Sequence, residues 1–236
     1  MIIWYIVVMA RKPMRNFPKI LLLSVGCAAA NVALGYLSIA ARTGLFLDSA
    51  FIITAAFSGG IGAGLLASLF TSLGGGIYYY FFYGRLAFWG VHLYVLCFAA
   101  TALVTWLFSR SFPDACMPLR LNRLPDAPPG PKNENLTVLD LIIMLSLLAL
   151  ALLIIISVMG ALISVFNSMV LQSVTLEEST ETTFKTGLLL WGFSPTLTEI
   201  LARIPINIID RPVSVLIGYG TSLLLKKIAP ASGIHS

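Results

Sequence analysis

Long apolar runs separated by short polar breaks occupy most of this chain. Six of the runs are candidate membrane crossings, near residues 20–41, 45–57, 61–83, 86–108, 139–166 and 212–225. A helix needs about 20 apolar residues to cross the hydrocarbon core of a bilayer. The runs are continuous and do not alternate, which favours helices over a transmembrane β-barrel. The pattern therefore predicts an all-α membrane bundle of about six transmembrane helices.

Two of these runs, 45–57 and 212–225, are short and would need a locally thin bilayer or extra flanking residues to cross. The segment 186–202 is expected to be re-entrant or interfacial instead of a full crossing. Proline interrupts helices, so a kink or half-helix is predicted near this segment. Three prolines lie in this part of the chain: Pro195, Pro205 and Pro212.

The polar breaks also predict how the chain is organised. The apolar stretch at the N-terminus is too short to span, and an interfacial leader is expected there. A proline-rich, charged stretch after the fourth run is typical of a hydrophilic connector. The expected parts are a leader (1–19), a first four-helix membrane half (20–110), a cytoplasmic connector (111–136), a C-terminal membrane half (137–228) and a tail (229–236).

Charge is scarce and unevenly placed. Only 11% of the residues are charged, whereas soluble domains carry about 25%. Lys and Arg concentrate before the first run, in the connector and after the last run, and the positive-inside rule assigns such segments to the cytoplasm. We therefore expect a multi-pass protein of the bacterial cytoplasmic (inner) membrane. Both termini would lie inside, and the acidic loop near 172–185 would lie outside.

Several classes of function have no signal in this sequence. The 15 basic residues lie in loops and at the ends of runs, so no nucleic-acid partner is expected. Three scattered cysteines and two distant histidines indicate neither a disulfide framework nor a metal site. Hydrolase, zinc-protease, P-loop and dinucleotide-binding motifs are absent, so we expect neither an enzyme nor a cofactor.

Small residues recur four positions apart in two of the runs, and such ridges let helix backbones approach closely. In the third run this spacing favours packing within the subunit. The residues of that ridge are Gly60, Gly64, Ser68, Ser72 and Gly76. Ala29 and Ala33 in the first run have the same spacing. They indicate either internal packing or a docking face for another membrane subunit.

Charged side chains at the start of the last apolar segment are the main candidates for a functional site. A charge at the bilayer centre costs roughly 2.5–3.5 kcal/mol on insertion scales. Such groups therefore tend to face a cavity or a partner, unless they lie in the headgroup layer. Aromatic and polar residues at the predicted outer ends form either an interfacial belt or the wall of an outward-facing small-molecule pocket. The candidate ligand-binding residues are Tyr79, Trp89, His92, Asn167, Glu199, Arg203, Asn207, Asp210 and Arg211.

Three passages resemble the substrate-binding S components of energy-coupling-factor (ECF) vitamin transporters, especially the riboflavin-type branch. The first runs from Asp48 to Gly64 (DSAFIITAAFSGGIGAG), and the second is IPINIIDRPVSVLIGY at 204–219. The third is AANVAL at 29–34, where Ala29 and Ala33 fit the family's AxxxA spacing. The sequence departs from the family at the second-to-third junction, where Ser58-Gly-Gly replaces the usual Gly-Pro.

The resemblance implies six helices with both termini inside and a ligand pocket near the outer surface. It also implies two kinds of partner, a transmembrane coupling subunit contacted by Ala29 and Ala33 and a pair of cytoplasmic ATPases. Asn207 and Asp210 would match polar positions that can reach the pocket. We therefore expect a membrane subunit that captures a vitamin-sized molecule for uptake. A ligand-sensing module of a bacterial signalling system remains the main alternative, and a membrane enzyme or a purely structural subunit would be further ones.

Overall fold

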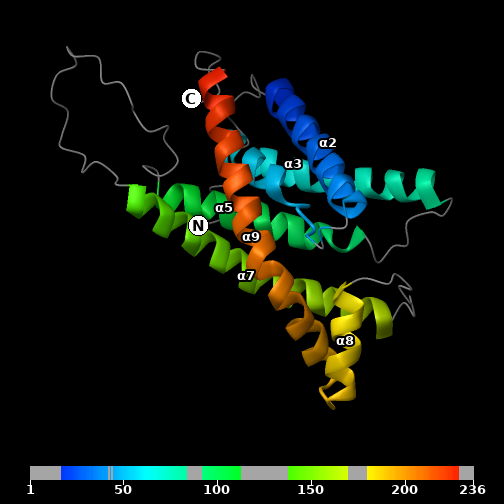
Figure 1. Ribbon diagram of the computed structural model, residues 1–236. Coiled ribbons are helices and arrows are strands. Elements are labelled where there is room, and N and C mark those ends of the chain that lie inside the picture. The colour runs from blue at the N-terminus through cyan, green and yellow to red at the C-terminus, as the bar shows by residue number, and fades with distance from the viewer. Residues whose placement is uncertain are drawn as a thin grey trace, which may run out of the picture.

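The computed structural model describes residues 17–41, 43, 45–83, 92–112, 138–169 and 180–228. Every element within these residues is a helix, which confirms the expected all-α fold for this part of the chain (Figure 1). Most of the expected leader, the connector and the tail lie outside the described residues. The helices are α2 (Phe17–Ala40), α3 (Ala50–Tyr83), α5 (Val95–Ser111), α7 (Val138–Met169), α8 (Thr180–Leu190) and α9 (Pro195–Ile228).

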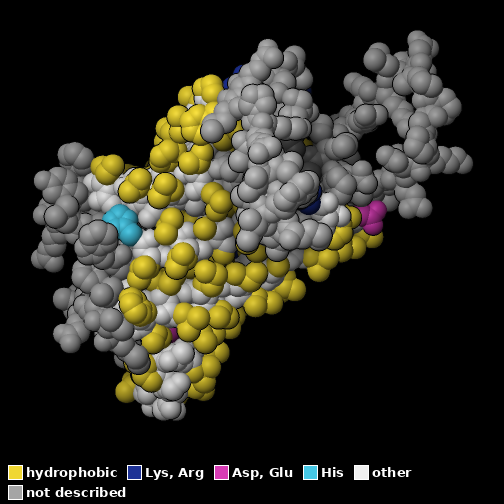
Figure 2. Space-filling model, turned by 180° about the vertical axis from the view of Figure 1, so that it is seen from behind, with side chains coloured by type: hydrophobic (Ala, Val, Ile, Leu, Met, Phe, Trp, Pro, Cys, Tyr) yellow, Lys and Arg dark blue, Asp and Glu magenta, His cyan; other side chains and the backbone are white. Residues whose placement is uncertain are grey.

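Three of these helices are long and apolar enough to cross a membrane, namely α2, α3 and α7. α5 is also apolar but shorter, at 17 residues. Hydrophobic side chains spread over much of the described surface seen in Figure 2, and few charged groups interrupt them. Water-soluble monomers rarely expose contiguous apolar patches of large size. Together these features indicate a membrane protein.

α3 corresponds to two of the predicted apolar runs. The sequence predicts separate helices at 45–57 and 61–83, whereas the structure has one helix of 34 residues that is kinked at Gly60. Gly60 has φ 74° and ψ −168°, a conformation that glycine adopts readily because it lacks a Cβ. The break is thus present at the expected place, but as a kink and not as a loop.

α3 lies at the centre of the bundle and packs against α2, α5 and α9, while α7 packs against α9 and α5. Close approach between helices depends on small residues. A Cβ added at Gly64 would lie 2.8 Å from the Cβ of Ala102 in α5. A Cβ added at Gly218 in α9 would lie 2.6 Å from the carbonyl oxygen of Ala50. At Gly64 the small ridge of α3 therefore packs within the subunit, as expected.

α9 is longer than the sequence predicts. The pattern places the start of the last helix near Pro212, but α9 begins at Pro195 and continues through Pro205 and Pro212 for 34 residues. That prediction was wrong because the signal for the start lies earlier. The Ser194 hydroxyl accepts a hydrogen bond from the amide of Leu197 at 3.3 Å, and proline is favoured in the first turn of a helix.

α8 and the first part of α9 form a helical hairpin that projects from the rest of the bundle (Figure 1). Gly192 ends α8 with φ 85°, as is common just after the C-terminus of a helix. The segment predicted to be interfacial or re-entrant, 186–202, is therefore the end of α8, a tight turn and the start of α9.

Candidate functional site

One side of α9 is polar and turned into the protein. From residue 203 to residue 214, polar residues recur at spacings that place them within a sector of about 100° of the helix, at 3.6 residues per turn. Asp210 is 0% exposed and Arg211 is 2% exposed. We call this side the polar face of α9. Its members are Arg203, Asn207, Asp210, Arg211 and Ser214.

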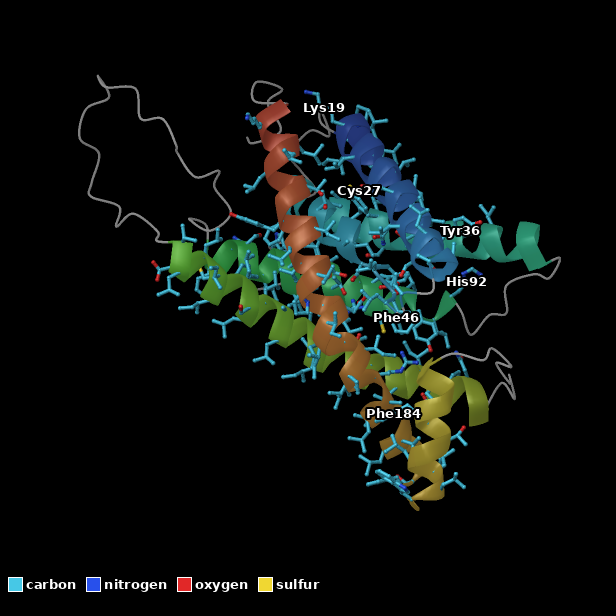
Figure 3. All side chains as sticks on the ribbon, viewed as in Figure 1. Lys19, Cys27, Tyr36, Phe46, His92 and Phe184 are labelled. Atoms are coloured by element: carbon cyan, nitrogen blue, oxygen red, sulfur yellow. The ribbon has the colours of Figure 1, made fainter. Side chains whose placement is uncertain are left out.

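Asp210 holds the loop that joins α2 to α3. Its Oδ1 accepts hydrogen bonds from the backbone amides of Phe46 at 2.9 Å and Leu47 at 2.8 Å. Successive amides of this kind form an anion-binding nest. Leu47 has φ 47°, a conformation that costs a residue with a Cβ roughly 1–2 kcal/mol. Figure 3 shows Phe46 among the side chains gathered near the middle of the bundle.

Arg211 binds the next two residues of the same loop. Its Nη1 donates to the hydroxyl of Ser49 at 2.7 Å, and its Nη2 lies 3.4 Å from Oδ1 of Asp48. Nη2 also forms an ion pair with Asp210. A buried charge is tolerated when it is paired and hydrogen-bonded in this way. We call this set of contacts the Asp210–Arg211 clamp.

Asn31 of α2 completes the attachment of the loop. Its side-chain amide donates to the carbonyl of Asp48, and its Oδ1 accepts from the amide of Phe51 at 3.1 Å. Asn31 is 1% exposed. The α2–α3 loop is therefore held from two helices that are about 180 residues apart in the chain.

Further along the polar face, contacts reach α5 and α7. The Asn207 amide donates to the hydroxyl of Ser157 at 2.8 Å. Arg203 donates to the Tyr94 hydroxyl at 3.1 Å and lies 5.7 Å from the centre of that ring, a cation–π geometry. Gly160 makes room for this guanidinium, since a Cβ added there would lie 2.9 Å from Nη1 of Arg203.

Some buried hydrogen-bonding atoms of α9 have no partner within the described residues. They are Nε of Arg211, Oγ1 of Thr198 and Oγ of Ser214. Thr198 and Ser214 are 2% and 0% exposed. Buried polar groups are almost always hydrogen-bonded, and each exception calls for an explanation. A polar molecule bound inside the bundle would supply the missing partners.

The other predicted site residues lie elsewhere or cannot be placed. His92 precedes α5, and its Nδ1 lies 3.4 Å from the hydroxyl oxygen of Ser72 in α3. Glu199 forms an ion pair with Lys185 of α8, with 2.8 Å between Oε2 and Nζ. Asn167 lies near the end of α7. Tyr79 belongs to α3 but its side chain is outside the described set, and so is all of Trp89.

Two apolar grooves occur on the surface. One, of about 520 Å³, lies between α2 and α3, and both Ala29 and Ala33 line it. The other, of about 560 Å³, lies between α7 and α9 and includes Pro212. None of the predicted ligand-binding residues lines either groove. Both alanines are exposed, so this part of α2 is accessible to a partner.

Sequence reasoning identified Arg203, Asn207, Asp210 and Arg211 of the polar face and missed Ser214. It also missed the residues that contact this face, since none of the following is among the predicted ligand-binding residues: Asn31, Asp48, Ser49, Tyr94 and Ser157. A polar residue within an apolar run is the one signal that marks Asn31 and Ser157. Scans against family models, curated proteins and solved structures found no match to the chain.

Proposed function

We propose that this protein is the substrate-capture subunit of an uptake transporter of the ECF type, with a small polar molecule as its ligand. The observation that carries this proposal is the polar face of α9. It places charged and amide groups inside an apolar bundle, and Arg211 and Ser214 have buried hydrogen-bonding atoms without a partner among the described residues. Intramembrane groups of this kind usually mark a substrate path or binding site.

The ligand would bind between α9, α5 and α7 and beneath the α2–α3 loop. Arg203 and Asn207 already contact α5 and α7 respectively. The Asp210–Arg211 clamp fixes the loop beside them. Binding would then favour a closed arrangement of these elements, because a ligand stabilises the state in which it makes more contacts.

The proposed topology is six crossings with both termini in the cytoplasm. α2, α3 and α7 are apolar enough for this role. α5 and α9 would complete the bundle, with the polar residues of α9 shielded from lipid. A count of six requires that the chain reverse its direction across the bilayer at the Gly60 kink of α3.

The groove lined by Ala29 and Ala33 would receive a transmembrane helix of the coupling subunit. It is apolar, and its small side chains let another backbone approach closely. Energy for transport would come from cytoplasmic ATPases bound to that subunit. Filling the groove with Ala29→Leu should abolish co-purification with the ATPases, while Leu22→Ala on the same helix should not. Co-purification with a kinase in place of ATPases would contradict transport.

Ligand capture is tested by native mass spectrometry of the gently purified protein. We expect a retained molecule of vitamin size. Ser214→Ala removes one buried hydroxyl of the polar face and should weaken its retention about ten-fold, or about 1.4 kcal/mol. Ile209→Ala, on the exposed side of α9, is the matched control. No retained ligand in wild-type protein, or equal retention in all variants, would refute the proposal.

A further inference from the structure

The turn between α8 and α9 carries large apolar side chains that point away from the protein. Leu190 is 82% exposed and Trp191 is 81% exposed. We call residues 189–197 the hairpin tip. The exposed large apolar residues of the tip are Leu189, Leu190, Trp191, Phe193 and Leu197. A loop that projects into water normally carries polar side chains, so water is a poor environment for this tip.

Charge is excluded from the tip. Residues 186–198 contain no Asp, Glu, Lys or Arg. The flanking charges, Lys185 and Glu199, form an ion pair at 2.8 Å with each other. Their side chains are only 21% and 19% exposed. The hairpin therefore presents neutral surface over its whole outer end.

The backbone of the turn is hydrogen-bonded within itself. Three backbone amides of the turn donate to backbone carbonyl oxygens of α8. The amide of Trp191 donates to the carbonyl of Gly187 at 3.1 Å, the amide of Gly192 to that of Leu189 at 3.0 Å, and the amide of Phe193 to that of Leu188 at 3.3 Å. A backbone polar group without a hydrogen-bond partner costs several kcal/mol in lipid. These three amides of the turn have partners, which lowers the cost of bringing the tip to the membrane.

The apolar surface of the tip continues along α9. Ile209 and Leu216 are exposed, and they lie on the side of the helix opposite the polar face. With 34 residues, α9 is about 51 Å long at 1.5 Å per residue, more than the roughly 30 Å of a hydrocarbon core, so contact of the tip with lipid requires a strongly tilted α9. The surface that faces lipid in the bundle thus extends without a charged interruption into the tip.

We propose that the hairpin tip binds the bilayer, with Trp191 and Leu190 embedded among the lipid chains. The hairpin then anchors the N-terminal part of α9 in the membrane and does not stand in water as a free lid. A second copy of the chain or another protein is a less suitable occupant, because the tip carries no charged side chain for recognition. This inference is independent of ligand capture, since it depends only on the outer side of the hairpin.

The test uses the full chain, reconstituted at one copy per lipid nanodisc. Trp4, Trp89 and Trp106 are replaced by Phe so that Trp191 is the single emitter. We expect blue-shifted emission that is quenched several-fold more by lipids brominated on the acyl chain than by acrylamide in water. Leu190→Glu should reverse this order, whereas the uncharged Leu190→Ala should keep it.

Quenching mainly by acrylamide in the single-tryptophan protein would overturn the proposal. So would the absence of quenching by either agent, because protein would then cover the tip. If the triple replacement does not fold, a spin label attached at Leu190→Cys gives an independent reading. Relaxation by oxygen stronger than by an aqueous nickel chelate would support lipid contact, and the reverse would refute it.

Discussion

Loss of the Asp210 carboxylate should destabilise the protein strongly. The side chain is 0% exposed, accepts two backbone amides and pairs with Arg211, which is 2% exposed. Hydrogen bonds to a charged group contribute roughly 1.5–3 kcal/mol each. Removal of one partner from a buried ion pair costs about 3–5 kcal/mol. The two estimates describe the same carboxylate and overlap, so we expect Asp210→Ala to lower the free energy of unfolding by about 3–5 kcal/mol.

The loss is measured as the free energy of unfolding in mixed detergent micelles, followed by circular dichroism. Asp210→Asn keeps an oxygen for the two loop amides and should cost less than Asp210→Ala. Ile209→Ala, one position away and 57% exposed, is the control and should change the free energy by no more than about 0.5 kcal/mol.

A double-mutant cycle tests the coupling itself. Arg211→Met combined with Asp210→Ala removes both charges, and the pair of changes should cost less than the sum of the single changes. Strictly additive costs would show that the two side chains do not act as a clamp. An effect of Asp210→Ala no larger than that of the control would refute the reasoning about burial altogether.

Three further changes have defined outcomes in the same unfolding measurement. Gly218→Ala forces a Cβ against the backbone of α3 and should cost about 1–3 kcal/mol, whereas Gly220→Ala, which has open space, should be neutral or stabilising; equal effects would argue against close packing there. Asn207→Ala should cost about 1–3 kcal/mol because it leaves the buried Ser157 hydroxyl without its donor. Adding Ser157→Ala to the same protein should remove most of that cost. Gly60→Ala places a Cβ at positive φ and should cost about 1–2 kcal/mol; no loss would mean that α3 straightens readily.

The hydrophobic pattern predicted much of the fold because apolar runs determine where membrane helices form. The runs at 20–41 and 139–166 correspond closely to α2 and α7. The glycines at 59–60 marked the kink of α3. The start of α9 was missed because proline was taken as a helix breaker. In this helix Pro195 lies in the first turn, and Pro205 and Pro212 lie within it.

The candidate site was predicted only on its α9 side. Charge in an apolar segment pointed to Arg203, Asp210 and Arg211. The partners could not be inferred, because the amide of Phe46 and the carboxylate of Asp210 are 164 positions apart in sequence. A pattern along the chain contains no information about which distant backbone amide a carboxylate will meet. The pairing forms during folding because a buried charged group must find hydrogen-bond partners.

The Asp210–Arg211 clamp also restricts how the molecule can move. Two adjacent residues of α9 grip four successive residues of the α2–α3 loop, so sliding or rotation of α9 alone would break every one of these contacts together. α9 and the α2–α3 loop should therefore move together as one rigid body. Any hinge that opens the interior would then lie at the other contacts of α9, where Arg203 meets Tyr94 and Asn207 meets Ser157.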